Sequence, residues 1–127
     1  MDKQTRTTKQ RSLMLAKLQE TCGHPTADEL YSITREALPH LSLGTVYRNL
    51  ELLARQGKVR CIENAGFQKR FDANLMPHHH VRCTRCGRVG DVETDMPRPD
   101  VKAAHAEGFT LTGAEIFFEG VCSMCKT

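Results

Sequence analysis

The sequence contains no tryptophan, and aromatic residues make up only 6 % of its 127 positions. It offers no cluster of aromatic side chains on which unpaired bases could stack, which disfavours a zinc-ribbon RNA-binding module. It also lacks any run of the roughly 18–20 apolar residues that a membrane span requires. The polar start, MDKQTRTTKQR, has no apolar core of a secretory signal. We therefore expect a cytoplasmic protein.

The composition is that of a globular protein, with 39 % hydrophobic and 26 % charged residues. The small net charge of +3 hides an asymmetry between the two halves of the chain. Residues 1–72 hold 12 Lys and Arg against 8 Asp and Glu, a net charge of +4, whereas residues 73–127 hold 6 against 7, a net charge of −1. The second half also holds four of the six cysteines and four of the six histidines. Because each half is small, we expect a metal site or a partner chain to stabilise it.

The first half is predicted to contain three helices and a β-hairpin. One helix covers residues 9–22, a second is capped by Thr26 with Glu29 three positions later, and a third runs from a Ser42 cap to Gly57. The predicted buried stripes are, in order, Met14, Leu15, Leu18 and Cys22; Leu30, Ile33 and Ala37; and Leu43, Val46, Leu50 and Leu53. Runs 58–63 and 67–72, joined by Asn64-Ala65-Gly66, form the hairpin. This order predicts a winged helix-turn-helix; a small α/β domain with a solvated third helix is the alternative.

The second half is predicted to be a small α/β domain. Strands are expected over 80–83, 89–93 and 109–118, and a helix over 99–107 between Pro99 and Gly108. We expect an α+β protein with a DNA-binding domain over 1–73, a hinge over 74–79 and a dimerisation and zinc-binding domain over 80–127.

Two Cys-x-x-Cys pairs carry the strongest chemical signal, Cys83 with Cys86 and Cys122 with Cys125, with 35 residues between the pairs. Four thiolates suit a closed, tetrahedral zinc site, and the arginines near the first pair favour the thiolate form. One alternative is that the four cysteines are free thiols or form two disulfides. Another is a thiol oxidoreductase, but this would need a βαβ unit before the first pair, which the predicted elements do not provide. Cys22 and Cys61 lie in apolar patterns and are interpreted as small buried hydrophobes.

The run His78-His79-His80 is the second signal. On a strand, His78 and His80 project to one face and His79 to the other, so the first two could chelate one ion. An exposed polar run that begins a strand is the alternative. Taken alone, His24, Asp72 and Asp91 are more typical of caps or solvated side chains, and local pattern does not connect them.

Taken together, the motifs resemble the ferric-uptake-regulator superfamily of bacterial metalloregulators. The resemblance covers nearly the whole chain and is carried by His24-Pro25-Thr26-Ala27-Asp28, Gly44-Thr45-Val46-Tyr47-Arg48-Asn49-Leu50, Arg70-Phe71-Asp72, His78-His79-His80-Val81-Arg82-Cys83-Thr84-Arg85-Cys86-Gly87 and Gly120-Val121-Cys122-Ser123-Met124-Cys125. It implies a homodimer, structural zinc on the four cysteines, and a regulatory site for Fe²⁺ or Mn²⁺ made by His24, Asp72, His78, His80 and Asp91. Such a nitrogen and oxygen ligand set suits these two metals.

Within this superfamily, the positions at which this sequence differs from the iron sensors favour the branch of peroxide-sensing repressors of the PerR type. Asp72 stands where iron sensors usually have Glu, and Asp91 also resembles the peroxide-sensing pattern. A further sensory site of many relatives is missing, since 112–115 contains no histidine and Pro77 and His79 stand at its other positions. The resemblance implies that Fe²⁺ reacts with H₂O₂ and that His24 and His78 are oxidised, which releases DNA. An iron-responsive uptake repressor is the alternative.

DNA binding would follow from such a dimer. Two third helices would enter successive major grooves of a palindromic, A·T-rich operator. Tyr47 and Arg48 are expected to contact bases or adjacent phosphates and Thr45 and Asn49 to assist; the candidates for phosphate contacts are Lys9, Arg11, Lys58 and Lys69. The expected protein is a sensor that reacts once, not an enzyme.

Overall fold

The computed structural model describes residues 6–126 apart from positions 22, 65 and 77. The chain divides into two compact units, Met1–Leu75 and Met76–Thr127, which we call unit 1 and unit 2. The hinge expected over 74–79 stays a prediction, and its Pro77 lies outside the described residues, as does Cys22.

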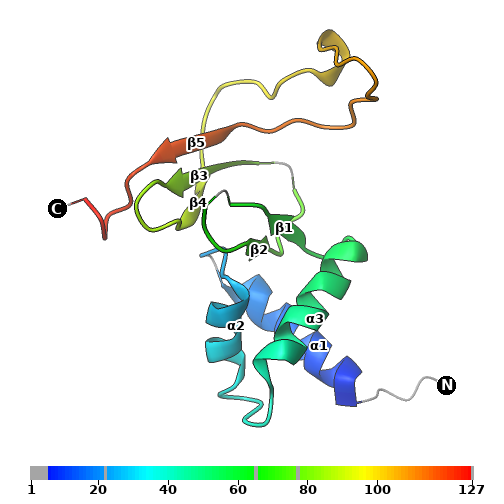
Figure 1. The fold of residues 1–127 in the computed structure, drawn as a ribbon, viewed down its shortest axis with the longest axis vertical. Helices are drawn as coiled ribbons and strands as arrows, with labels where there is room; N and C mark the ends of the chain where they lie inside the picture. The colour runs from blue at the N-terminus through cyan, green and yellow to red at the C-terminus, as the bar shows by residue number, and fades with distance from the viewer. Residues whose placement is uncertain (1–5, 22, 65, 77, 127) are drawn as a thin grey trace. The chain divides into compact units, whose positions relative to one another are not determined.

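Unit 1 contains three helices followed by a two-stranded sheet, as Figure 1 shows. Its elements are α1 (Arg6–Glu20), α2 (Ala27–Thr34), α3 (Leu43–Arg55), β1 (Arg60–Ile62) and β2 (Arg70–Asp72). The strands are antiparallel, with Cys61 opposite Phe71 and Arg60 opposite Asp72. This is the order of a winged helix-turn-helix, so the predicted fold of the first half is confirmed.

Side-chain caps fix where α2 and α3 begin. Thr26 accepts a hydrogen bond from the backbone N–H of Glu29, and the Glu29 carboxylate accepts one from the N–H of Thr26, which is a complete capping box. Ser42 accepts from the N–H of Thr45 in the same way. Beyond α3, Gly57 has a φ of 74°, a left-handed conformation that glycine adopts without steric cost. The predicted starts of both helices are therefore confirmed.

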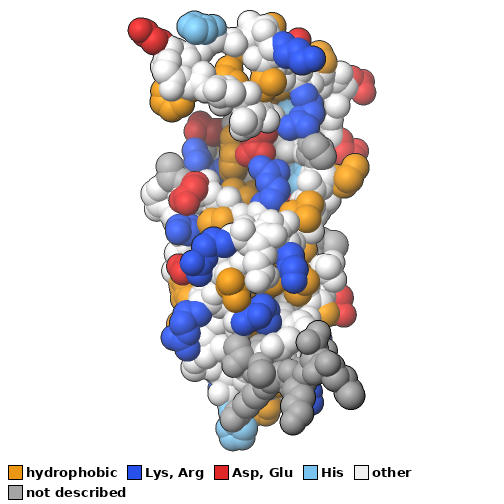
Figure 2. Space-filling model, turned by 90° about the vertical axis from the view of Figure 1, so that its right-hand side faces the viewer, with side chains coloured by type: hydrophobic (Ala, Val, Ile, Leu, Met, Phe, Trp, Pro, Cys, Tyr) orange, Lys and Arg blue, Asp and Glu red, His pale blue; other side chains and the backbone are white. Residues whose placement is uncertain are grey.

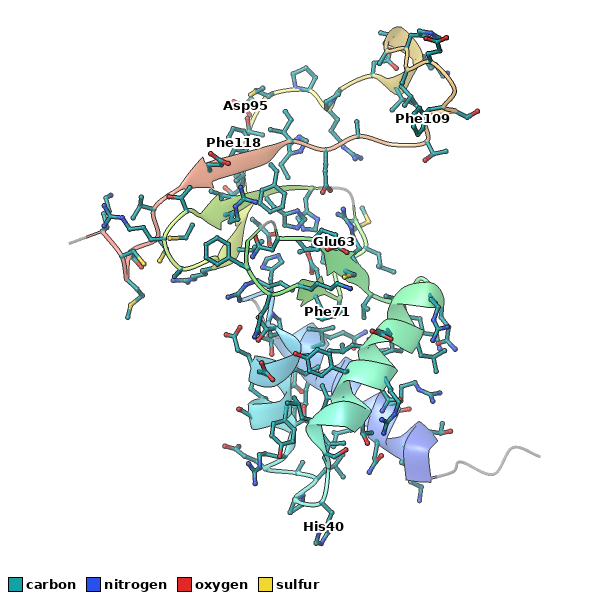
Figure 3. The ribbon with its side chains drawn as sticks, viewed as in Figure 1. His40, Glu63, Phe71, Asp95, Phe109 and Phe118 are labelled. Carbon is teal, nitrogen blue, oxygen red and sulfur yellow. The ribbon has the colours of Figure 1, made fainter. Side chains whose placement is uncertain are left out.

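The core of unit 1 lies between the three helices and one face of the hairpin. Its fully buried side chains are Met14, Leu18, Ala27, Leu30, Leu41, Val46, Leu50, Leu53, Val59 and Phe71. Phe71, labelled in Figure 3, joins β2 to this core. Half-buried Cys61 packs against it, in keeping with the predicted small hydrophobe.

Three of the predicted core positions in unit 1 are wrong. Helix α2 ends at Thr34, where the N–H groups of both Ala37 and Leu38 bond to the Thr34 carbonyl, so exposed Ala37 lies in a turn beyond the helix. Thr34 instead takes the buried position one turn after Leu30, which leaves Ile33 exposed. Leu43 is exposed because it is the first residue of α3, outside the packed part of the helix.

Unit 2 is built on a three-stranded sheet with the order β4-β3-β5. The strands are β3 (His79–Cys83), β4 (Val89–Val92) and β5 (Phe117–Gly120). The central β3 is antiparallel to β4 and parallel to β5, with Cys83 opposite Gly120. The predicted strands in 80–83 and 89–93 are confirmed to within one residue at their ends.

Two other predictions for unit 2 are wrong. The helix expected over 99–107 is only a 3₁₀ turn, η1 (Val101–Ala103), because such a short segment needs tertiary packing and none of these residues is fully buried. The strand expected over 109–118 begins only at Phe117, where it can pair with β3. Phe109, beside η1 in Figure 3, is 77 % exposed. The described part of unit 2 therefore contains no α-helix, and no helix among the described residues of the chain is long and apolar enough to cross a membrane.

Candidate metal centres

The four cysteines of the two Cys-x-x-Cys pairs meet at one end of the sheet in unit 2. Cys83 ends β3 and Cys86 lies in the turn towards β4, whereas Cys122 and Cys125 follow β5. Because β3 and β5 are parallel, the two pairs leave the sheet at the same end. The four Sγ atoms all lie within 4.8 Å of one another. The predicted grouping of these residues is therefore confirmed.

Hydrogen bonds shift the pKa values of these thiols in opposite directions. The backbone N–H of Cys122 donates to Sγ of Cys83 at 3.4 Å. Together with the N–H of Cys86, this contact lowers the pKa of the Cys83 thiol to about 6. In contrast, the hydrogen bond with the Cys122 thiol raises the pKa of Cys125 to about 12. Burial opposes ionisation of Cys122, but hydrogen bonds from the N–H of Cys125 and from the Cys86 thiol outweigh it and lower the pKa of Cys122 as well. Without a cation, Cys83 and Cys122 are thus the thiols that ionise more readily, and Cys125 is the one that stays protonated.

A zinc ion fits this donor set. Four sulfurs around one zinc, each about 2.3 Å from the metal, lie about 3.8 Å from one another in a tetrahedron. The Sγ atoms of Cys86 and Cys122 are 3.7 Å apart. The positive ion would also stabilise the thiolate of Cys125, whose pKa is kept high by the hydrogen bond with Cys122 and by burial. All four ligands come from protein, which is typical of a structural rather than a catalytic zinc site.

In unit 1, His24 and Asp72 form a buried pair. Nε2 of His24 lies 3.2 Å from Oδ2 of Asp72. His24 precedes α2, and Asp72 ends β2. The two residues are thus brought together by the packing of the hairpin beside the start of α2, where the N–H of Phe71 donates to the carbonyl of Pro25 at 2.9 Å.

In unit 2, His78, His80 and Asp91 form a second cluster. His80 on β3 lies opposite Asp91 on β4. Nε2 of His78 is 3.0 Å and Nε2 of His80 is 3.8 Å from Oδ1 of Asp91. Nδ1 of His78 lies 2.6 Å from the carbonyl oxygen of Met76, which can only accept a hydrogen bond. The proton of a neutral His78 is therefore on Nδ1, and the lone pair on Nε2 faces the carboxylate. A cation between the two would relieve this contact.

Each cluster fits part of the coordination shell of a hard or intermediate divalent ion. Ligand atoms on an octahedral ion at about 2.1 Å lie about 3 Å apart, close to the nitrogen–oxygen separations in both clusters. Imidazole with carboxylate suits Fe²⁺ or Mn²⁺ better than a metal that prefers thiolates. The sequence identified these five residues only through family resemblance, and the packing within each unit now joins them into two clusters.

His79 points away from its two neighbours, as strand alternation predicts. Its Nδ1 accepts a hydrogen bond from the backbone N–H of Ile116 at 3.0 Å, just before β5 begins. This contact between residues 37 positions apart had no signal in the sequence. His40 and His105 are exposed.

The third candidate site is the outward face of α3. Thr45 is half-exposed and Tyr47 and Arg48 are exposed, and Nη2 of Arg48 donates to Oγ1 of Thr45 at 3.2 Å. The face of unit 1 seen in Figure 2 carries more Lys and Arg than Asp and Glu side chains. These features are compatible with phosphate and base contacts.

Asn49 does not belong to that face. It is only 4 % exposed, and its Oδ1 accepts a hydrogen bond from Nε of Arg11 at 3.2 Å. Asn49 therefore joins α3 to α1, and the expectation that it assists in DNA contact is corrected. Asn49 follows Val46 by three positions and precedes Leu53 by four, so helical spacing places it beside the buried stripe, although its polar side chain suggested exposure.

Comparison with known proteins agrees with these features. The model of the ferric uptake regulator family matches residues 2–119. The peroxide operon regulator of Bacillus subtilis is 32 % identical over 122 residues, which span 95 % of this chain and 84 % of that protein. The peroxide-responsive repressor PerR of Staphylococcus epidermidis is also 32 % identical over 122 residues, which span 95 % of this chain and 81 % of that protein.

Solved structures share the fold. The crystal structure of the Campylobacter jejuni peroxide stress regulator is 29 % identical, with a TM-score of 0.70 over 94 % of this chain and 91 % of that chain. The ferric uptake regulator of Helicobacter pylori is 20 % identical, with a TM-score of 0.73 over 94 % of this chain and 81 % of that chain. The second likeness concerns the fold alone. With its winged helix, its four-cysteine cluster and these relatives, the chain belongs to the ferric uptake regulator family.

Proposed function

We propose that this protein is a metal-dependent, DNA-binding transcriptional repressor that senses peroxide. The observation that carries the proposal is that aspartate is the carboxylate partner of histidine in both clusters, Asp72 beside His24 and Asp91 beside His78. The 32 % identity to two proteins named as peroxide regulators supports the same choice. The chain would react once per signal, so it is a sensor and not an enzyme.

The regulatory ion would be Fe²⁺ or Mn²⁺, bound by His24 and Asp72 of unit 1 together with His78, His80 and Asp91 of unit 2. Three nitrogens and at least two carboxylate oxygens would complete a shell that neither unit can provide alone. An ion held in this way would restrain unit 1 relative to unit 2. The four cysteines would hold Zn²⁺ separately and keep unit 2 folded.

When bound, Fe²⁺ supplies the reduction of hydrogen peroxide, a reaction that Mn²⁺ undergoes poorly. The side chains exposed to the oxidant are the ligands themselves, and we propose His24 and His78 as those that are modified. An oxidised imidazole is a poorer ligand, so one unit would lose its hold on the ion. The DNA-binding units of a dimer would then be free to separate.

The operator would be a palindrome read by the two copies of α3 in a homodimer, and A·T-rich sequence is our proposal for it. Tyr47 and Arg48 would make the main contacts, supported by Thr45. Exposed lysines would neutralise phosphates, which makes the affinity decrease as salt increases; the candidates are Lys9, Lys58 and Lys69.

One experiment tests the proposal directly. The zinc-loaded protein is prepared with Fe²⁺ or with Mn²⁺, treated with hydrogen peroxide, and assayed for operator binding. We expect peroxide to release only the Fe²⁺ form from DNA. Mass spectrometry should find the addition of one oxygen atom on peptides that contain His24 or His78.

The same experiment separates the alternative, an iron-responsive uptake repressor. The ligand chemistry favours Fe²⁺ in both cases. If the Fe²⁺ form binds the operator but peroxide neither releases it nor modifies His24 or His78, the alternative replaces our proposal. An Asp72→Glu variant that remains iron-responsive and becomes insensitive to peroxide would tie the distinction to that carboxylate.

A further inference from the structure

The backbone of His24 is in an unusual conformation. Its φ is 49°, and among the described residues no other non-glycine residue has a positive φ. A side chain in this left-handed region is sterically disfavoured, so the surrounding structure has to hold it there. The conformation directs the imidazole towards Asp72, with Nε2 3.2 Å from Oδ2.

Two hydrogen bonds from β2 hold the segment that carries His24. The backbone N–H of Phe71 donates to the carbonyl of Pro25 at 2.9 Å. Nη1 of Arg70 donates to the carbonyl of His24 at 3.1 Å. The consecutive residues Arg70 and Phe71 thus donate to the carbonyls of His24 and Pro25, which are also consecutive. Asp72, the partner of His24, is the next residue of the same strand.

Arg70 is itself held by Glu29 on α2. Its Nη1 donates to Oε1 of Glu29 at 2.9 Å, and the Arg70 side chain is only 12 % exposed. The same Oε1 accepts the hydrogen bond from the N–H of Thr26 in the capping box. Oε1 of Glu29 therefore has two roles: it caps the start of α2, and it holds the guanidinium that donates to the backbone carbonyl of His24. Because a guanidinium stays charged and has a planar set of donors, it can hold both acceptors in a defined geometry.

We propose that Arg70, fixed by Glu29, is a positioning residue for the His24–Asp72 ligand pair. Its contact with His24 is to the backbone carbonyl, and it acts through the backbone of this ligand. The inference rests on the proposed function, since the position of His24 matters only if the pair binds a metal. It also links the ligand to α2, and so to the helix-turn-helix.

The test compares Mn²⁺ binding by zinc-loaded, full-length variants, measured by calorimetry or electron paramagnetic resonance. Arg70→Met keeps the aliphatic stem and removes both hydrogen bonds. We expect its Mn²⁺ affinity to decrease about 10- to 100-fold, the range seen when groups that orient metal ligands are removed. Arg70→Lys keeps the charge and one donor to Glu29 and should lose less. If Arg70→Met fails to fold, Arg70→Lys and Glu29→Gln carry the test.

Two controls separate positioning from general stability. Arg35→Met makes the same substitution at an exposed arginine that directly follows α2, and should leave Mn²⁺ affinity unchanged. Ser42→Ala removes the cap of α3 and destabilises unit 1 without touching His24. If Arg70→Met binds Mn²⁺ as weakly as a Ser42→Ala protein of equal melting temperature, the role of Arg70 is only structural and the inference is wrong.

The wild type distinguishes failure of this inference from failure of the proposed function. A wild type that binds no Mn²⁺ or Fe²⁺ contradicts the proposed function, and with it any positioning role. A wild type that binds Mn²⁺ while Arg70→Met and Arg70→Lys bind it equally well contradicts the inference alone. Reduced affinity in Arg70→Met, partial recovery in Arg70→Lys and no change in Arg35→Met support it.

Discussion

The Sγ atoms of Cys86 and Cys122 lie 3.7 Å apart although 36 positions separate the two residues in the chain. The parallel pairing of β3 with β5 produces this closeness, since it brings the ends of two distant strands side by side. The cluster therefore depends on the sheet, and the small sheet depends in turn on what the cluster binds.

We expect Cys122→Ser to lose most of its bound zinc and to lower the melting temperature of unit 2. A hydroxyl is a poor replacement for a thiolate ligand, and structural zinc supplies a large part of the folding free energy of small domains. Zinc content is measured by mass spectrometry and melting by circular dichroism. Cys61→Ser, outside the cluster, is the matched control and should keep its zinc. Full zinc content in Cys122→Ser would contradict the assignment of this ligand.

Zinc binding should release protons unequally from Cys83 and Cys125. The Cys83 thiol, with a pKa of about 6, is already ionised at neutral pH, whereas Cys125, with a pKa of about 12, has to lose a proton when zinc binds. Zinc affinity should therefore increase as pH increases above neutral, and it should fall more steeply with decreasing pH below about 6, where Cys83 of the zinc-free protein takes up a proton.

Calorimetry in buffers of different ionisation enthalpy counts these protons. Cys125→Ser should release about one proton fewer per zinc than the wild type, and Cys83→Ser should release about the same number at neutral pH. If both variants release the same number of protons per zinc, Cys83 and Cys125 do not differ in protonation before zinc binds.

Arg48→Ala should weaken operator binding about 10-fold or more while zinc content and the dimer stay intact. Loss of one arginine contact to a base or phosphate typically costs about 1–3 kcal/mol. If the contact is to a phosphate, the dependence of affinity on salt should also become shallower. Arg98→Ala in unit 2, whose guanidinium bonds to the Ala114 carbonyl, removes the same charge and serves as the control. Unchanged affinity of Arg48→Ala at fixed salt would remove Arg48 from the DNA-binding face.

Thr26→Ala should destabilise unit 1 by about 1 kcal/mol, because it leaves the N–H of Glu29 without its capping oxygen. Urea unfolding followed by circular dichroism measures the change. Ser32→Ala is the comparison, since exposed Ser32 bonds only to the Asp28 carbonyl within the same helix. Equal stability of the two variants would show that the box contributes little to the fold.

The exposed Phe109 offers a test of the predicted homodimer. It is 77 % exposed, and other large apolar side chains of unit 2 are also exposed, namely Met76, Met96, Leu111, Val121 and Met124. Apolar exposure of this kind is typical of a surface that a partner covers. Phe109→Asp should shift the protein towards monomer in sedimentation experiments while zinc content is retained. A stable dimer of this variant would place the interface elsewhere.

What the sequence could predict was local. The Thr26 cap, the Ser42 cap and the Cys-x-x-Cys pairs follow from spacings of two or three residues, and they are found as expected. The pairing of His24 with Asp72 joins residues 48 positions apart in the sequence, and family resemblance alone suggested it. The burial of Asn49 agrees with its helical spacing from Val46 and Leu53, but its hydrogen bond with Arg11 depends on where α1 packs, which periodicity does not contain. The helix expected over 99–107 had local signals but found no packing surface.

Strand β3 contains a ligand of each candidate metal centre, His80 and Cys83, three residues apart. An extended strand spans about 3.3 Å per residue, so the two groups are about 10 Å apart on one stiff segment. Because β3 is the central strand of a sheet that we expect zinc to stabilise, His80 would be held in place for a second ion only after zinc is bound. In a cell short of zinc, such a protein would accumulate in a form that responds to neither iron nor manganese, whatever their supply. The order in which the metals are acquired would thus follow from the position of both ligands on β3.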